Sequence, residues 1–275
     1  MKNSLHKKTI AILFHEKDTP SSIQQYLITH YAHFWHEMGL RVVALFGVNL
    51  YVPADLIVVH VDLSVVPEKY FAFAARYPIV VNGKVRDIRK SSVSRNLVDG
   101  NSAYQGQVIV KSNCNYAGMP ERRYIHAGNP EACLFQNPLD YKIYQSFADI
   151  PSNMLQAKDL VVEKFLPEYE DGLYHIRFYN FLGNHGNCMR VASRSPVVHI
   201  SHAVKVEQIP FDPRVEQLRQ DLGFDYGKFD YVVRDNEVVL LDTNKTTGFV
   251  GRVDDPHMQE ARRHRAMGIY DYFQS

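Results

Sequence analysis

Hydrophobic residues in the first part of the chain gather in short runs that are typical of buried strands. TIAILF (9–14), RVVALF (41–46) and DLIVVHV (55–61) are rich in branched apolar residues without strict alternation, as in strands covered on both faces. Between the first two, apolar residues recur at three- and four-residue spacings from 23 to 38, which predicts a helix. The strand, helix, strand order predicts a parallel sheet, and PIVV (78–81) would add a fourth strand.

The pattern changes near residue 85, where a polar and basic stretch with helical potential begins. Further strands are predicted at 106–112, 159–166, 174–183 and 187–194, a helix over 212–223, a closing hairpin, and a basic helix at the C-terminus. Residues 119–158 contain several prolines and predict loops and short turns. The chain is therefore expected to be an α/β protein with a boundary near residue 85.

Composition narrows the class of protein without naming a function. The 275 residues carry 31 Lys and Arg against 30 Asp and Glu, so the basic footprint of a nucleic-acid binder is absent. Three cysteines, far apart and odd in number, fit neither a disulfide framework nor a zinc site. No apolar run is long enough for a signal core or a membrane span. We expect a cytoplasmic protein that binds neither nucleic acid nor membrane.

The closing hairpin, FDYVVRDNEVVLLDTNKTTG, contains the residues with the clearest chemical meaning. Asp242 and Asn244 are two apart on a strand and share a face. If the turn is tight around Asp235 and Asn236, Asp230 lies almost opposite Asp242. Paired carboxylates repel each other unless a hard cation such as Mg²⁺ joins them. The alternative is an amphipathic hairpin with solvent-facing acids, but the apolar run VVLL before Asp242 favours a buried strand.

The order of four segments resembles the ATP-grasp superfamily, with D-alanine:D-alanine ligase the closest general comparison. These segments are VIVKS (108–112), VVEKFL (161–166), GKFD (227–230) and LLDTN (240–244). The resemblance spans roughly residues 85 to 250. It implies an N-terminal open parallel sheet followed by a two-lobed ATP-grasp fold. The implied parts are a Rossmann-like pre-ATP-grasp domain (1–84), a small lobe (85–162) and a C-terminal lobe with the metal site (163–275).

The resemblance also implies ATP and magnesium as cofactors, with one or two ions and Mn²⁺ as an alternative. Asp230 and Asp242 would hold one ion, while Asp242 and Asn244 would hold a second. Asp242 stands where glutamate is commoner in the family, which shortens its reach by one methylene.

Several cations are assigned to the phosphates by the same resemblance. Lys111, at the end of a strand, would pair with the α- and β-phosphates as a point charge. Lys90 resembles the first lysine of the family, although Arg86 and Arg89 compete for that role. The loop after Lys111, SNCNYAG, would cover the phosphates, but it has one glycine where relatives often have more.

The adenine and ribose side would be formed by the segment between the lobes. Residues matching it are Glu163, Lys164, Phe165 and Leu166. Glu170, seven residues after Glu163, has the spacing of the acid that accepts the ribose hydroxyls, with Glu168 and Asp171 as competitors.

Two further cations are candidates for catalysis. Lys228, two residues before Asp230, faces the same side of the strand, and Arg190 is a second candidate. Such charges matter because phosphoryl transfer is catalysed mainly by positioning and by neutralising charge. Lys245 is not a general family feature, and on an extended strand it would point away from the metals.

The function implied is an ATP-dependent ligase that joins a carboxylate to an amine or similar nucleophile through an acyl phosphate. Two alternatives stay open. One is a phosphotransferase that uses the same two-lobed ATP-binding fold, and the other is a nucleotide-binding protein without turnover. The substrates would be a small-molecule carboxylate and a nucleophile. The first 84 residues and residues 119–158 would line the site that binds the acceptor. Arg177, Arg194 and Lys205 could recognise a carboxylate, and the oligomeric state is not indicated.

Overall fold

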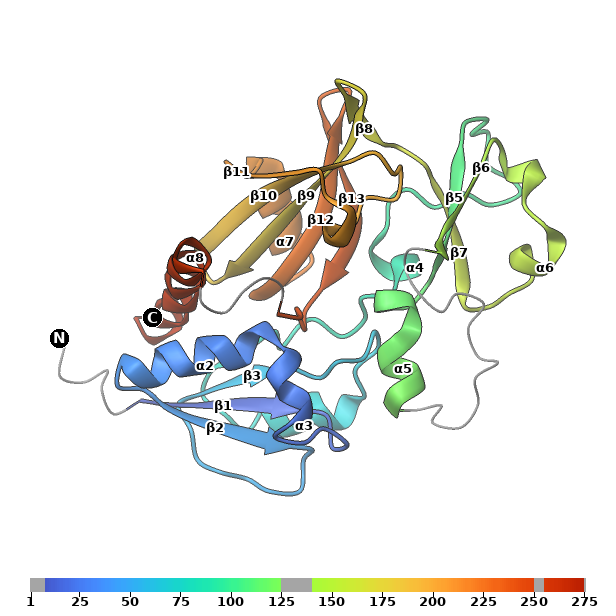
Figure 1. The fold of residues 1–275 in the computed structure, drawn as a ribbon. Helices are drawn as coiled ribbons and strands as arrows, with labels where there is room; N and C mark the ends of the chain where they lie inside the picture. Colours follow the sequence, from blue (N-terminus) through green and yellow to red (C-terminus); the bar gives the residue numbers. More distant parts are fainter. Residues whose placement is uncertain (1–7, 125–139, 250–254, 275) are drawn as a thin grey trace.

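Three β-sheets form the framework of the protein, which a computed structural model describes over residues 8–124, 140–249 and 255–274 (Figure 1). One sheet is parallel and two are antiparallel. The predicted mixed α/β class is therefore confirmed. Part of the stretch expected to be loops, residues 125–139, lies outside the described residues.

The N-terminal sheet is parallel, and its four predicted strands are confirmed. Their spatial order is β2 (Arg41–Phe46), β1 (Thr9–Phe14), β3 (Leu56–Val59) and β4 (Val80–Val81). Helices α2 (Leu27–Glu37) and α3 (Glu68–Ala74) pack on opposite faces of this sheet, each with its own cluster of buried apolar residues. Burial on both faces explains why the strands read as unbroken apolar runs.

The helix predicted between β1 and β2 is interrupted at Tyr26. A 3-10 turn, η1 (Ser22–Gln25), precedes it, and Tyr26 itself is extended with φ −90° and ψ 141°. The cause is pairing with a distant segment, because Tyr26 forms a β-bridge with Gly248 and Leu27 N donates to the Thr247 carbonyl at 2.9 Å. The segment that follows the closing hairpin, which ends at Asn244, is thereby attached to the N-terminal sheet.

A small antiparallel sheet follows, with strand order β6 (Lys142–Tyr144), β5 (Val108–Ser112) and β7 (Leu160–Lys164). Strand β7 runs through the boundary expected at residue 163. The helical potential of residues 88–98 produces only one turn, α4 (Lys90–Val93), which is held to the end of β5 because Lys90 N donates to the Asn113 carbonyl. The remaining short helices here are η2 (Asn115–Gly118), α5 (Met119–Tyr124), η5 (Phe147–Asp149) and α6 (Ser152–Leu155).

The largest sheet is antiparallel and contains the closing hairpin. Its strands are β11 (Lys205–Ile209), β10 (His185–Ser193), β9 (Leu173–Leu182), β12 (Tyr226–Arg234) and β13 (Glu237–Asn244), with β8 (Glu168–Glu170) paired to β9. The pattern did not predict β6, β8 and β11, which are short, partly polar strands at sheet edges.

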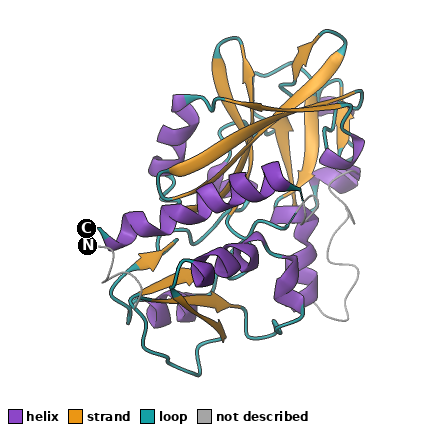
Figure 2. Ribbon diagram, turned by 60° about the vertical axis from the view of Figure 1, so that its left-hand side comes forward, coloured by secondary structure: helices purple, strands orange, loops and turns teal. Residues whose placement is uncertain are grey.

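Helices cover both sides of this sheet. Helix α7 (Pro213–Asp221) begins as predicted, since the Asp212 side chain accepts a hydrogen bond from Arg214 N at 2.9 Å. The C-terminal helices α8 (Pro256–Ala266) and η7 (Met267–Phe273) lie between the large sheet and the parallel sheet (Figures 1 and 2). Trp35 of α2 donates to the Ala266 carbonyl at 2.7 Å, which joins α2 to α8. The turn η6 (Ile200–His202) precedes β11.

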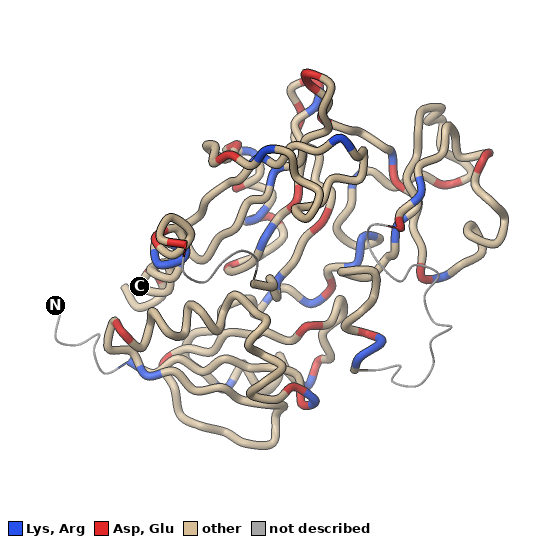
Figure 3. The backbone as a smooth tube through the Cα atoms, viewed as in Figure 1, with Lys and Arg blue, Asp and Glu red and all other residues tan. Residues whose placement is uncertain are grey.

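Charged residues of both signs lie on the strands of the two antiparallel sheets, whereas the strands of the parallel sheet are almost free of charge and contain only Arg41 (Figure 3). None of the helices in the described ranges combines the length and the apolarity needed to cross a bilayer.

His60 gives the N-terminal sheet a sensitivity to acid. The residue is fully buried just after β3, and neither ring nitrogen has a hydrogen-bond partner among the described residues. Its ring packs edge-on against Phe14 and Tyr26, with centroid distances of 5.2 and 4.9 Å. Burial lowers the pKa of His60 from 6.5 to about 3, so the folded protein holds this imidazole neutral.

We predict that His60→Leu flattens the dependence of stability on acid. Below pH 6.5 the unfolded chain binds a proton that folded His60 rejects, so the free energy of unfolding falls by up to about 1.4 kcal/mol per pH unit. Urea unfolding at pH 7, 6, 5 and 4 would show a smaller loss in the variant. His36→Leu, an exposed control on α2, should keep the wild-type slope, and equal slopes for His60→Leu and wild type would refute the assignment.

Candidate active site

A β-bulge in the closing hairpin brings Asp230 and Asp242 into opposition. The turn is tight, with Asp235 and Asn236 both left-handed at φ 50° and 61°. Regular pairing from that turn would set Asp230 against Leu241, but the register shifts by one residue between Asp230 and Tyr231. Asp230 therefore pairs with Asp242, as predicted. On a shared face the two side chains begin about 5 Å apart.

Each of these carboxylates is paired with a lysine. Lys228 Nζ lies 2.8 Å from Asp230 Oδ1, and Lys90 Nζ lies 3.2 Å from Asp242 Oδ1. Lys90 is 2% exposed. Burial raises the pKa of Asp230, the charge of Asp242 raises it further, and Lys228 opposes both effects. Two acids and two cations thus form one compact, electrically balanced group.

The donor chemistry of this group fits magnesium. Lys228 pairs across the strands with Asn244, which places the amide next to the two carboxylates. The Asn244 Oδ1 atom accepts from Thr246 N at 2.8 Å, and the Thr246 hydroxyl lies 3.3 Å from the same oxygen. Over the described residues, no three His, Cys, Asp or Glu side chains gather as a metal centre. A set of two carboxylates and one amide suits an ion that completes its shell with water and phosphate oxygens.

The geometry separates Lys90 from its competitors. Arg86 pairs with Glu68 and stacks over the Phe71 ring, while Arg89 Nη2 lies 2.6 Å from Asp87 Oδ2. Only Lys90 among the three lies beside Asp242.

Lys111 and Glu163 form a buried ion pair between neighbouring strands. Lys111 Nζ lies 2.7 Å from Glu163 Oε2, and the side chains are 10% and 2% exposed. Lys111 Nζ also lies 3.4 Å from the Leu241 carbonyl, on the strand that carries Asp242. The ammonium of the small sheet therefore reaches the metal-facing strand of the large sheet.

One cavity of about 940 Å³ brings most of the predicted residues together. Its lining includes Lys90, Lys111, Lys164, Phe165, Leu166, Lys228, Asp230, Asp242 and Asn244. Apolar residues Ile109, Tyr141 and Ile176 lie in the same wall. The Lys164 ammonium also lies 5.3 Å from the centroid of the Tyr104 ring.

Arg190 does not join this group, which corrects the role expected for it. Arg190 pairs across the sheet with Arg177, and Arg177 pairs with Tyr231, the neighbour of Asp230. Because successive residues of a strand face opposite sides, Arg190 lies on the face away from Asp230. Which residues of β10 share a face with Asp230 of β12 depends on the register of the strands between them. The alternation pattern of one strand does not reveal that register.

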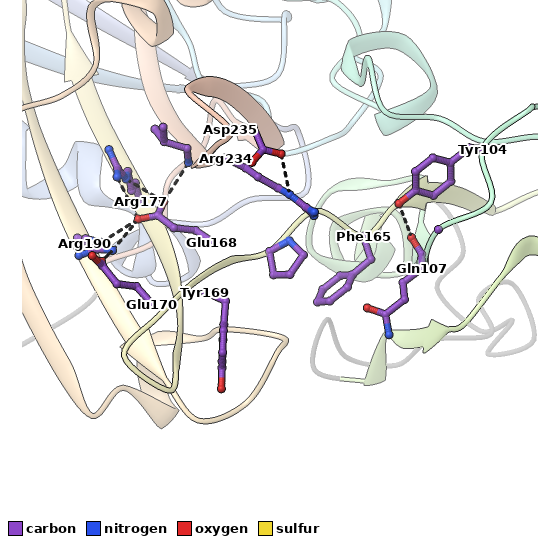
Figure 4. Close-up of a pocket in the computed structure, with 13 residues that line it drawn as sticks. Tyr104, Gln107, Phe165, Glu168, Tyr169, Glu170, Arg177, Arg190, Arg234 and Asp235 are labelled. Atoms are coloured by element: carbon purple, nitrogen blue, oxygen red, sulfur yellow. Dashed lines mark hydrogen bonds and ion pairs between the residues drawn. The ribbon is translucent and has the colours of Figure 1, made fainter.

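Glu170 also lies elsewhere, in a second, more open pocket of about 740 Å³ (Figure 4). Its carboxylate pairs with Arg190 at 2.5 Å. In the same pocket Glu168 lies between Arg177 and Arg190, at 3.0 and 2.8 Å. Neither of these glutamates nor Asp171 lines the larger cavity. Glu170 has the expected seven-residue spacing from Glu163, but strand β8 directs its side chain away from the larger cavity.

The loop after Lys111 has an unusual backbone. Tyr116, Ala117 and Gly118 are all left-handed, with φ of 46°, 53° and 73°. Only glycine adopts this conformation without strain. Asn115 N donates to Ser64 Oγ at 2.8 Å, so the loop is attached to the N-terminal part.

The segment after Asn244 continues into the N-terminal part as well. Lys245 points away from the metal-facing side, as expected for an extended residue, and its ammonium donates to the Leu63 carbonyl. Burial lowers the pKa of Lys245 to about 8. Thr246 Oγ1 donates to Asp62 Oδ1 at 2.6 Å.

The far wall of the cavity comes from residues that the sequence interpretation missed. Arg262 and Arg265 of α8 line it, together with Gln25–Leu27 of the N-terminal part. Two arginines three apart in the basic helix EARRHRA were the available signal, because that spacing places them on one helical face. Arg177, Arg194 and Lys205, the earlier candidates for a substrate carboxylate, are not in the lining.

Solved structures that resemble the chain over nearly its whole length have the ATP-grasp fold. D-alanyl-alanine synthetase A from Vibrio cholerae O1 biovar eltor shares 10% identity, with 98% of each chain covered and a TM-score of 0.52. A RimK domain ATP-grasp protein from Sphaerobacter thermophilus shares 12% identity over 97% of this chain and 100% of that chain, with a TM-score of 0.52. D-alanine–D-alanine ligase from Bacillus anthracis, complexed with ATP, shares 10% identity over 97% and 96%, with a TM-score of 0.51.

No family model and no curated protein matches the sequence. The likeness is one of structure, and it shows that this chain has the fold of the ATP-grasp superfamily. The resemblance found in the four sequence segments is thereby confirmed.

We predict that the Lys111–Glu163 pair is strongly coupled. Glu163→Gln leaves a buried ammonium without its anion and should lower the free energy of unfolding by roughly 3 kcal/mol. In a double-mutant cycle measured by urea unfolding, the double variant Lys111→Met, Glu163→Leu should lose less free energy of unfolding than the sum of the losses for Lys111→Met alone and Glu163→Leu alone. Additive losses would show that the two side chains do not interact.

Proposed function

We propose that the protein is an ATP- and Mg²⁺-dependent ligase that joins a carboxylate to an amine or similar nucleophile. The reaction would pass through an acyl phosphate and release ADP and phosphate. The observation that supports this most directly is the opposition of Asp230 and Asp242, with Lys90, Lys111 and Lys228 in the same cavity of an ATP-grasp fold.

The cations provide what phosphoryl transfer needs from a protein. The transferring group carries charge on its oxygens, so catalysis comes mainly from positioning and electrostatic stabilisation. Lys111 and Lys90 would contact the phosphates from the small lobe, and Lys228 would contact the transferring phosphoryl group from the sheet. Magnesium bound by Asp230, Asp242 and Asn244 would neutralise phosphate charge.

The apolar end of the cavity suits a nucleobase. Phe165 and Leu166 lie there with Ile109, Tyr141 and Ile176, and apolar walls on both sides of a planar ring are common in such sites. Lys164 is the polar group at this end. Glu163, whose carboxylate is engaged by Lys111, would contribute through its backbone.

The other end of the cavity would hold the carboxylate and the nucleophile. Holding them in line with the transferring phosphorus can supply roughly 7–11 kcal/mol of the barrier lowering. The walls here come from α8 and Gln25–Leu27. Of residues 119–158, which were expected on the acceptor side, the described part adds Pro120 to the cavity lining besides Tyr141 of the apolar end.

We predict that Mg²⁺ and ATP together stabilise the protein and that Asp242→Asn removes this effect. A ligand at about 100 times its dissociation constant adds roughly 2.7 kcal/mol, or about 5–10 °C in Tm for a chain of this size. Arg190→Gln is the matched control, because Arg190 lies on the opposite face of the same sheet and should retain the stabilisation. Differential scanning fluorimetry with and without EDTA measures both.

Turnover distinguishes a ligase from its alternatives. ADP release that requires a carboxylate and an amine together supports the ligase. ADP release with a stably phosphorylated hydroxyl compound indicates a phosphotransferase, and stabilisation by ATP without ADP release indicates a binding protein. Lack of stabilisation by any nucleotide would contradict the whole proposal.

A further inference from the structure

A buried cation with neutral partners forms part of the far wall of the large cavity. Arg265 is 5% exposed. Its Nε donates to the Tyr31 hydroxyl at 2.7 Å, and its Nη1 donates to the Asn187 side-chain oxygen. No carboxylate among the described residues forms an ion pair with it, and Nη2 has no partner there. Removing a charge from water without an opposite charge is costly, so this arrangement favours an anion.

A second arginine lines the same cavity one turn away on α8. Arg262, one turn earlier on α8, is 2% exposed and stacks over Phe249, with its guanidinium carbon 4.3 Å from the ring centroid. Among the described residues, Asp255 at the start of α8 accepts through Oδ1 from the backbone nitrogens of His257 and Met258. The carboxylate therefore caps the helix.

A row of polar side chains connects this wall with the proposed metal residues. Asn244, Lys228, Asn180 and Asn187 are successive cross-strand partners on β13, β12, β9 and β10. All four line the cavity, and Asn187 is the residue bonded to Arg265. Since adjacent strands lie about 4.8 Å apart, the three steps of this row span roughly 14 Å.

We infer that Arg265 binds an anionic end group, a carboxylate, of an elongated substrate whose reacting group lies at Asp230 and Asp242. This inference rests on the proposed ligase function and specifies its substrate class. The span between the reacting atom and the remote carboxylate is roughly 10–14 Å, which corresponds to an extended segment of about three peptide units. Single amino acids are too short to occupy both positions.

The wall between the two ends is compatible with such a molecule. Phe178 and Met189 belong to the row next to the asparagines, and Met258 and Ala261 of α8 face the same cavity. Apolar side chains beside Asn180 and Asn187 can accommodate a chain that has both apolar and amide groups.

The first experiment uses wild-type protein with Mg²⁺ and a non-hydrolysable ATP analogue. Tri-alanine tests whether the elongated substrate is the amine nucleophile (the amine arm). Succinyl-dialanine tests whether it is the carboxylate that is activated (the carboxylate-donor arm). Isothermal titration compares each free acid with its C-terminal amide. We expect the acid to bind about tenfold or more tightly in the arm that the enzyme uses, because a charge-assisted hydrogen bond is lost in the amide. Equal affinities, or no binding of either form in both arms, would overturn the inference.

Variants of α8 then test whether the preference for the free acid over the amide depends on Arg265. Arg265→Gln should abolish the preference for the acid, and Arg265→Lys should keep part of it. Arg263→Gln is the matched control, because Arg263 is on the same helix but pairs with Glu37 and faces Phe34; it should keep the full preference. If Arg265→Gln folds and still prefers the acid, Arg265 is not the binding group. If Arg265→Gln does not fold, the comparison of acid and amide binding to the wild-type protein decides whether the inference holds.

Failure of this inference can be distinguished from failure of the proposed function. Stabilisation by Mg²⁺ and ATP that disappears in Asp242→Asn tests the nucleotide site alone. If that stabilisation is present and acid and amide bind equally, only the substrate assignment is wrong. If nucleotides do not stabilise the protein, the same titrations without nucleotide still test Arg265 as an anion site.

Discussion

The opposition of two carboxylates in the closing hairpin is the constraint on which the rest of the site depends. One unpaired residue in β13 changes the register, so that two acids and not one share the cavity face. Their mutual repulsion is offset by Lys90 and Lys228, which come from different parts of the chain. The charge balance therefore links the small sheet to the large one. Lys111, which is buried against Glu163 within the small sheet, adds a second link because its Nζ lies 3.4 Å from the Leu241 carbonyl of β13.

The segment that follows Asn244 ties the same hairpin to the N-terminal sheet. It interrupts a helix at Tyr26, places an ammonium against the Leu63 carbonyl and a hydroxyl against Asp62. These contacts bring Gln25–Leu27 into the lining of the cavity that also contains Asp230, Asp242 and residues of α8. The N-terminal sheet, which has no predicted catalytic group of its own, thereby contributes residues to the lining of the large cavity.

Much of the fold could be predicted from residue patterns, because strands covered on both faces and helices with capping residues have local signals. The four parallel strands, α7 with its Asp212 cap and the hairpin turn are examples. The edge strands β6 and β11 have few apolar residues and were missed. At the site, alternation and turn geometry within one hairpin place Asp230 within one residue of Asp242, and a bulge that the sequence pattern does not reveal completes the pairing. Arg190 and Glu170 lie on other strands, and their faces are set by pairing with distant segments, so spacing along the chain could not place them.

The attachment of residues 245–249 has a mechanical consequence. Asn244 is the last residue of β13, and its neighbour Lys245 is already fixed to the N-terminal sheet. The backbones of Asn244 and Lys245 are joined by a single planar peptide unit, which is stiff. A rotation of the N-terminal sheet would pull directly on one oxygen donor of the proposed metal site. If the proposed metal site forms, contacts made at Gln25–Leu27 would therefore be coupled to the position of its amide donor through adjacent residues of one segment.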